Sequence, residues 1–139
     1  MAHPFLERIQ SGPVLCDGAM GTMLHSIGVP LDACFDELNL TRRDDVLSIH
    51  RDYIAAGADI IETNTFGANR FRLAEHRLES RVRDINFRGA KLASEARETS
   101  GVPVLIAGSI GPTGRAQMPY GLIDPDDVQA AFREQIEAL

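Results

Sequence analysis

Three short segments combine acidic, amide and hydroxyl side chains with glycine, and each follows an apolar run. The first is DGAMGT, which begins at Asp17 after Val14-Leu15-Cys16. The second is ETNTFGAN, which begins at Glu62, and the third is GSIGPTG, which begins at Gly108. Carboxylate, amide and hydroxyl groups at the ends of apolar strands can bind a small polar ligand, such as an ammonium or hydroxyl donor. Glycines would let the backbone come close to that ligand.

Each segment also has a purely structural interpretation. Asp17 would point its carboxylate into a cleft, with Gly18 beside it, or it would only cap the following turn. Asn64 and Thr65 would contact a ligand or belong to a loop held by its own hydrogen bonds, because buried polar groups need partners. Ser109 would belong to a loop whose backbone N–H groups hold an anion, or to a tight turn. The residues alone leave these alternatives open.

Other kinds of chemistry are not favoured by the sequence. It contains no GxxxxGK[ST] or GxGxxG phosphate-binding loop, and an acid at the start of DGAMGT would repel phosphate. The four histidines are scattered, and Cys16 and Cys34 match no zinc motif, so no metal site is expected within this chain. Cys16 is expected to be a buried strand residue, Phe66 a packing residue, and His50 a residue facing solvent or another helix.

The composition is that of an ordinary acidic globular protein. The chain has 139 residues, 44% of them hydrophobic and 24% charged, with a net charge of −6. This length is typical of about one domain, and the negative charge disfavours a nucleic-acid partner. No apolar run approaches the roughly 20 residues that span a membrane, and the N-terminus does not resemble a signal peptide. We therefore expect a cytoplasmic protein with reduced cysteines and no membrane partner.

The elements that must position the three segments alternate between strands and helices. Strands are expected at 14–16, 59–63 and 102–107. Helices are expected at 4–10, 32–38, 80–99 and 124–139, and from an N-cap at Thr41 to a stop at Gly57. This order is typical of parallel β/α units, whose strand-end loops lie side by side at one edge. The fold class is therefore α/β, with the three polar segments at one face.

Apolar stripes on the two last helices predict which faces are buried. The stripe of the helix at 80–99 consists of Val82, Ile85, Gly89, Leu92 and Ala96. The stripe of the last helix consists of Val128, Ala131, Phe132, Ile136 and Leu139. This recurrence at helical spacing is typical of helices with one apolar face.

Taken together, DGAMGT, ETNTFGAN and GSIGP resemble the homocysteine S-methyltransferase domain. That domain occurs in cobalamin-dependent methionine synthase, in betaine–homocysteine methyltransferase and in bacterial fusions with methylenetetrahydrofolate reductase. The resemblance extends from Val14 to Leu139. It implies a (β/α)8 barrel in which zinc, held by three cysteine thiolates, binds the sulfur of homocysteine. Transfer of a methyl group to that sulfur gives methionine.

The resemblance also implies roles for particular residues. Asp17 and Gly18 would bind the amino acid end of homocysteine, and Asn64, Thr65 and Ser109 would be further wall residues of the substrate site. The zinc cysteines of the family lie later in the domain than the part that Val14 to Leu139 resembles, and neither cysteine of this chain matches them. No catalytic residue and no metal ligand is therefore expected within the chain.

A complete (β/α)8 barrel needs about 250 residues, whereas this chain offers three strands. The resemblance thus implies that residues 1–139 are the N-terminal part of a truncated domain, a partial barrel of about three β/α units. Such a piece exposes strand edges and an apolar face, so we expect it to be marginally stable or to aggregate when alone. The methyl donor is left open between methyltetrahydrofolate through cobalamin, betaine and S-methylmethionine. A folate-linked bacterial enzyme is favoured, with cobalamin or folate domains, or a reductase, as fused partners.

Two other interpretations are compatible with the same residues. The first is an inactive fragment that binds neither zinc nor homocysteine. The second is an unrelated barrel enzyme, such as an aldolase-like lyase, in which Asp17 takes part in acid–base chemistry.

Overall fold

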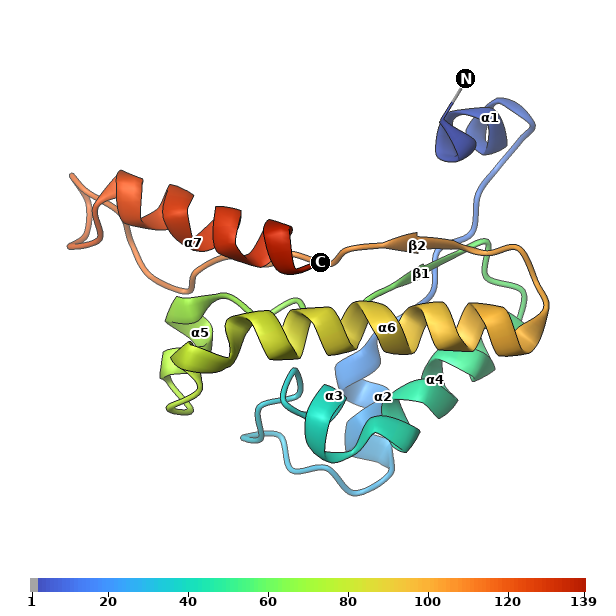
Figure 1. Cartoon of the computed structure of the whole chain (residues 1–139), viewed down its shortest axis with the longest axis horizontal. Helices are drawn as coiled ribbons and strands as arrows, with labels where there is room; N and C mark the ends of the chain where they lie inside the picture. Colours follow the sequence, from blue (N-terminus) through green and yellow to red (C-terminus); the bar gives the residue numbers. More distant parts are fainter. Residues whose placement is uncertain (1–2) are drawn as a thin grey trace.

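The structure, a computed structural model, describes residues 3–139 and follows a β/α order with additional short helices (Figure 1). Its elements are α1 (Pro4–Gln10), α2 (Met20–Ser26), α3 (Leu38–Thr41), α4 (Arg43–Ala55), β1 (Ile60–Glu62), α5 (Arg70–Ala74), the 3-10 helix η1 (Glu79–Arg81), α6 (Val82–Ser100), β2 (Leu105–Ala107) and α7 (Pro125–Ala138). No helix within residues 3–139 is both long and apolar enough to cross a membrane.

The sheet is small and parallel. β1 pairs with β2, with Ile60 opposite Leu105. The predicted strand at 14–16 is reduced to one parallel bridge between Cys16 and Ile60. Its pairing stops there because the Leu15 N–H donates to the Asp59 carboxylate, at 2.9 Å, instead of to a strand carbonyl. The α/β class is thus confirmed, and β1 lies between the Cys16 segment and β2.

The long helices lie where the sequence predicts them. The N-cap predicted at Thr41 and the helix predicted at 32–38 differ from the structure. Gly57 and Gly101 end α4 and α6 in the left-handed conformation, at φ 103° and 68°. Thr41 is not the N-cap of α4 as predicted. It is the last residue of α3, and its hydroxyl donates to the Glu37 carbonyl at 3.3 Å. The helix predicted at 32–38 begins only at its last residue.

Helices α2 and α5 were not predicted, and both are short. α2 begins at Met20, inside DGAMGT, and α5 begins at Arg70, directly after ETNTFGAN. Leu24 of α2 and Leu73 of α5 are fully buried, so tertiary packing holds these helices despite their weak local signals.

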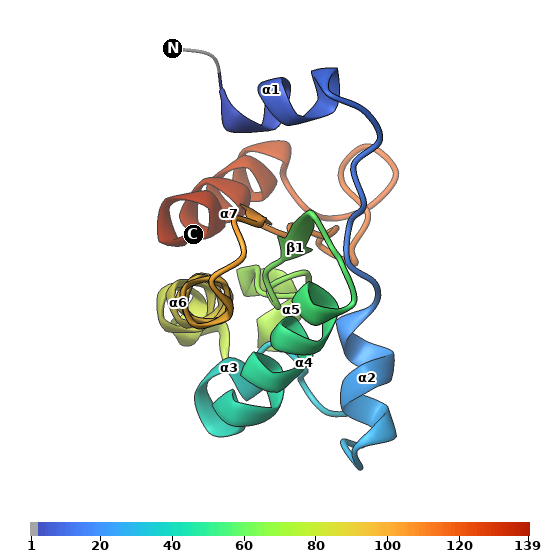
Figure 2. The same cartoon turned by 90° about the vertical axis from the view of Figure 1, so that its right-hand side faces the viewer.

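The main core lies between the strands and helices α4 and α6. Figures 1 and 2 show α6 running along one side of the strands, with α4 packed against it. The five stripe residues predicted for α6 are all buried. The stripe predicted for α7 is only partly right, because Ile136 is 58% exposed and the neighbouring Gln135 is fully buried.

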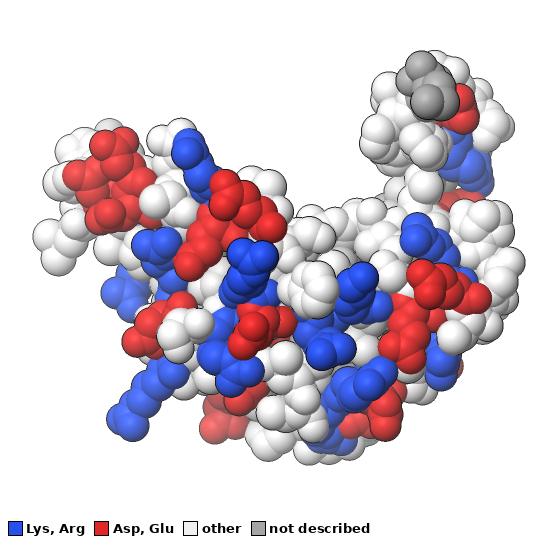
Figure 3. Space-filling model, in the orientation of Figure 1, with Lys and Arg blue, Asp and Glu red and all other residues white. Residues whose placement is uncertain are grey.

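The other side of the strands is open. Figure 3 shows a hollow between α1 and α7, and Figure 1 places the strands beneath it. The residues of β2 are only half-buried, and α1 has no buried residue. An ion pair of 2.9 Å between Arg8 and Asp59 ties α1 to the start of β1. The structure thus leaves one face of the sheet without a helical cover. The low stability expected of such a piece stays a prediction.

The close approach of α6 to the loop after β1 depends on Gly89. A Cβ atom at this position would lie 2.6 Å from Thr65 Cγ2 and 2.8 Å from Asn39 Nδ2. Both neighbours are fully buried and hydrogen-bonded, so neither can move freely. Inside a helix, alanine is ordinarily favoured over glycine by about 1 kcal/mol. We nevertheless expect Gly89→Ala to destabilise the protein by about 2 kcal/mol, because overpacking and disturbed hydrogen bonds outweigh helix propensity.

Hydrogen exchange of the α6 amides in the full-length protein measures this effect locally. The control is Ser94→Ala, a change to alanine on the same helix, which should leave exchange nearly unchanged. Slower or equal exchange in Gly89→Ala would show that α6 does not need this glycine.

Candidate functional site

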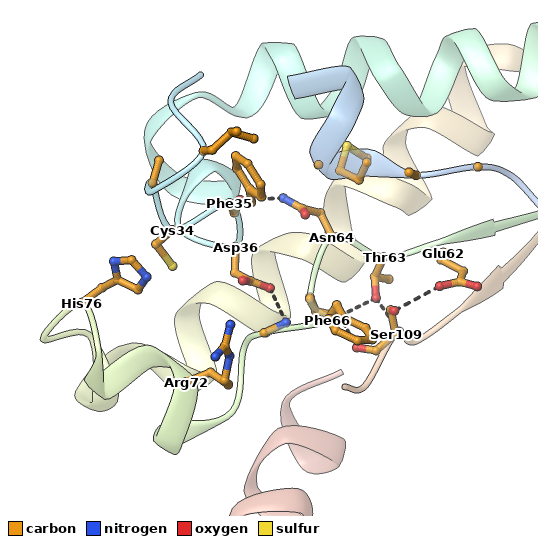
Figure 4. A pocket seen from close by; sticks show the side chains of 18 of the residues that line it. Cys34, Phe35, Asp36, Glu62, Thr63, Asn64, Phe66, Arg72, His76 and Ser109 are labelled. Atoms are coloured by element: carbon orange, nitrogen blue, oxygen red, sulfur yellow. Dashed lines mark hydrogen bonds between the residues drawn. The ribbon is translucent and has the colours of Figure 1, made fainter. Parts of the chain in front are cut away.

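The three polar segments meet in one cleft at the carboxyl ends of the strands (Figure 4). The cleft has a volume of about 550 Å³. All five residues predicted for the site line it, namely Asp17, Gly18, Asn64, Thr65 and Ser109. They converge because parallel strands place their carboxyl ends at one edge, where the following loops build the site.

Asp17 combines the two roles that the sequence left open. Its Oδ2 accepts a hydrogen bond of 3.0 Å from the Glu62 N–H, so the carboxylate caps the end of β1. No other residue among 3–139 donates a hydrogen bond to this carboxylate. Burial raises the pKa of Asp17, and the nearby Glu62 carboxylate adds to the rise, whereas the hydrogen bond from the Glu62 N–H opposes it. The carboxyl is therefore partly desolvated and open on one side.

Glu62 and Ser109 complete this end of the cleft. The Ser109 hydroxyl donates to Glu62 Oε2 at 3.0 Å, which joins the ends of β1 and β2 (Figure 4). In the described part of the chain, neither Asp17 nor Glu62 forms an ion pair with a lysine or arginine. Two carboxylates without a basic partner give this end a negative potential, which favours a cationic group such as an ammonium.

Asn64 and Thr65 form part of a hydrogen-bonded loop rather than an open set of donors. Asn64 Nδ2 donates to the Phe35 carbonyl at 2.8 Å and to Asn39 Oδ1 at 3.1 Å. The Thr65 hydroxyl donates to the Ser109 carbonyl at 2.8 Å. Both side chains are buried. They shape the wall of the cleft, with these donors already used within the protein.

Close packing of aromatic side chains explains why positions 18 and 21 are glycines. A Cβ atom at Gly18 would lie 2.8 Å from the hydroxyl oxygen of Tyr53, which donates to the Ala19 carbonyl at 2.8 Å. A Cβ atom at Gly21 would lie 3.1 Å from the ring of Phe35. The two glycines thus make room for aromatic side chains on α4 and on the loop before α3.

The loop after β2 uses its backbone donors internally. The Ser109 N–H donates to the Thr63 hydroxyl at 2.9 Å, and the Gly111 N–H donates to the Phe66 carbonyl at 2.9 Å. A Cβ atom at Gly111 would lie only 2.6 Å from that carbonyl oxygen. These two N–H groups therefore join the loops after β1 and β2 and are not free to hold an anion.

The far end of the cleft contains residues that were not predicted to belong to a site. They are Cys34, Phe35, Asp36, Arg72 and His76, from the loop before α3 and from the region of α5 (Figure 4). Asp36 accepts a hydrogen bond of 3.0 Å from the Gly67 N–H, and burial raises its pKa to about 6. Burial also raises the pKa of the Cys34 thiol. None of them follows a predicted strand, and α5 was not predicted, so the β/α pattern gave no signal for them.

Two expectations about single residues were wrong. Cys16 is exposed rather than buried, because its strand has only one neighbour. Phe66 is 62% exposed and lines the cleft instead of packing in the core.

The described residues do not fit a zinc ion of the expected kind. No group of three or more His, Cys, Asp or Glu side chains in residues 3–139 is placed to hold a metal. Of the two thiols, only that of Cys34 lines the cleft.

Comparison with known proteins identifies the family. The profile of the homocysteine S-methyltransferases matches residues 14–139. The chain belongs to this family. Two methionine synthases, from Mycobacterium tuberculosis (strain ATCC 25618 / H37Rv) and Mycobacterium leprae (strain TN), are 40% and 37% identical to it. Each match covers 77% of this chain and 10% of the methionine synthase.

The structure also resembles solved structures of a homocysteine methyltransferase. The homocysteine methyltransferase MmuM from Escherichia coli matches with a TM-score of 0.81 in its metallated form and 0.83 in its oxidized form. In both, the identity is 26%, and the match covers 99% of this chain and 53% of MmuM. The chain thus spans about a tenth of the length of the methionine synthases and about half of MmuM.

Proposed function

We propose that residues 1–139 form the N-terminal part of a homocysteine S-methyltransferase domain, a partial (β/α)8 barrel. The intact domain would transfer a methyl group to the thiolate of homocysteine and release methionine. Membership of the family, the match to half of MmuM and the open side of the sheet support this proposal. The observation that carries it is the convergence of the three strand-end segments on one cleft with an acidic end.

In this proposal the acidic end of the cleft binds the amino acid end of homocysteine. Asp17 Oδ1, free of hydrogen bonds with the described residues, would accept from the α-ammonium, with Gly18 beside it. Asn64, Thr65 and Ser109 would form the adjoining wall. The bond between Asn64 and Asn39 and the bond between Thr65 and Ser109 would hold this wall rigid. A rigid wall lowers the entropic cost of ordering the site around a small ligand.

The reacting end of the site is proposed to come from residues outside this chain. Zinc held by three cysteines would favour the thiolate of homocysteine at neutral pH. Residues 3–139 offer no such set, so we assign them no step of the methyl transfer.

The similarity to methionine synthases favours methyltetrahydrofolate, acting through cobalamin, as the methyl donor. Cobalamin and folate domains, or a fused reductase, would then be the partners, in a cytoplasmic protein.

The proposal is tested by incubating the zinc-loaded full-length protein with homocysteine and each of three donors. These are methyltetrahydrofolate with cobalamin, betaine and S-methylmethionine. We expect methionine, measured by mass spectrometry, with one donor, and its loss after zinc chelation. No methionine with any donor, and no heat of homocysteine binding, would favour an inactive fragment. Carbon–carbon bond cleavage of an aldol substrate would favour the lyase.

A further inference from the structure

Helix α7 buries a glutamine in place of its neighbouring isoleucine. Gln135 is fully buried, whereas Ile136 is 58% exposed. The buried face of α7 consists of Val128, Ala131, Gln135 and Ala138. Burying a polar amide is unfavourable unless its groups find hydrogen-bond partners, so hydrophobic packing alone does not explain this choice of face.

The Gln135 amide reaches the loop that forms the cleft wall. Its Nε2 donates to the Thr65 carbonyl at 2.8 Å and to Asn86 Oδ1 at 3.1 Å. The preceding carbonyl, that of Asn64, accepts a bond of 2.7 Å from Asn39 Nδ2. Two consecutive backbone carbonyls are therefore held by side-chain amides from two different helices, α7 and α3.

This loop in turn holds Ser109. The Thr65 hydroxyl donates to the Ser109 carbonyl at 2.8 Å, and the Ser109 N–H donates to the Thr63 hydroxyl at 2.9 Å. Ser109 then donates to Glu62 at the acidic end of the cleft. Gln135 thus contacts a wall residue of the cleft, Thr65, from behind, although Gln135 itself does not line the cleft.

We propose that Gln135 is a positioning residue for the substrate site. From outside the cleft, its amide fixes the backbone at Thr65 and, through it, the place of Ser109 and Glu62. The inference rests on the proposed function, because it assigns Gln135 a part in binding homocysteine.

The incomplete hydrogen bonding of Gln135 separates this role from a general contribution to stability. Its Oε1 is buried without a partner among residues 3–139. An unpaired buried acceptor offsets much of what the two donated hydrogen bonds contribute. An apolar residue of the same shape removes this unpaired acceptor, although it also leaves the Thr65 carbonyl and Asn86 Oδ1 without their donor. We therefore expect the fold to persist and the loop at Thr65 to shift.

The test uses Gln135→Met in the zinc-loaded full-length protein, with Gln129→Met as the matched control. Gln129 is exposed on the same helix. We expect Gln135→Met to raise the KM for homocysteine by about three- to tenfold, the effect of one lost neutral hydrogen bond, with kcat little changed. The amides of residues 63–68 should exchange with solvent faster than in the control. A variant with unchanged KM, or with a lower kcat alone, would overturn the inference.

Gln135→Glu adds a readout that a packing role would not affect. A protonated glutamate can donate to the Thr65 carbonyl, whereas an ionised one cannot. Burial raises the pKa of a carboxyl group, so the glutamate should be protonated at about pH 6 and ionised at about pH 8. The KM of Gln135→Glu for homocysteine, divided by the wild-type KM, should therefore be near one at about pH 6 and rise toward about pH 8. A ratio that does not depend on pH would contradict the role of the donated hydrogen bond.

Failure of the proposed function gives a different result. In that case the wild-type protein forms no methionine from homocysteine. The amide exchange of residues 63–68 still reports on Gln135, because it requires no activity. Equal exchange in Gln135→Met and Gln129→Met would overturn the inference in either case.

Discussion

Replacing Asp17 by asparagine in the full-length protein should raise the KM for homocysteine by about 10- to 100-fold. The amide oxygen can still accept from the Glu62 N–H, so the end of β1 keeps its cap. What the variant loses is the negative charge opposite the ammonium of the substrate. A hydrogen bond between charged groups contributes about 1.5–3 kcal/mol, which corresponds to this change in affinity.

The control for this prediction is Asp32→Asn. Asp32 also lines the cleft and is exposed, but it belongs to the loop before α3 rather than to a strand end. Steady-state kinetics of both variants should show a large effect for Asp17 alone. Equal effects would mean that the cleft attracts homocysteine only through its overall charge. An unchanged KM in Asp17→Asn would remove Asp17 from the substrate site.

Lowering the pH should decrease the free energy of unfolding by up to about 3 kcal/mol, because His50, on α4, is buried as the neutral imidazole. Both ring nitrogens of His50 lack a hydrogen-bond partner among residues 3–139. Burial lowers its pKa from 6.5 to about 4. Between these two values the unfolded chain takes up a proton that the folded chain does not. The contribution of neutral His50 to the free energy of unfolding is therefore fully present above about pH 6.5 and is lost as the pH falls toward 4.

Hydrogen exchange of the α4 amides, followed across this pH range, measures the effect. His50→Leu should remove most of the pH dependence and should be at least as stable at neutral pH, because it removes two unpaired polar atoms. The control is His25→Leu, at the exposed end of α2, which should keep the pH dependence. A persistent pH dependence in His50→Leu would assign it to another group.

The sequence predicted the parts of this fold whose signals repeat. The stripe of α6 recurs over several turns, so its buried face followed from spacing alone. Residues after predicted strands could likewise be assigned to one edge, and all five lie in the cleft. These predictions succeeded because parallel β/α topology places strand ends together whatever the details of each loop.

The remaining differences arise from tertiary contacts that local patterns do not contain. On α7, the hydrophobicity of Ile136 favoured the wrong face, since the amide of Gln135 finds partners in the loop after β1 that only the folded chain provides. Cys16 was expected to be buried, but its strand has one neighbour only. The far end of the cleft was missed because α5 depends on the burial of Leu73 rather than on local propensity.

We propose that the acidic end of the cleft recognises the amino group of homocysteine. It is tested most directly by comparing homocysteine with 4-mercaptobutanoate, which lacks only that amino group, as ligands of the zinc-loaded full-length protein. We expect the wild-type protein to prefer homocysteine by about 10- to 100-fold and Asp17→Asn to lose most of this preference. Equal affinity for the two thiols in the unchanged protein, or a preference that survives in Asp17→Asn, would contradict it.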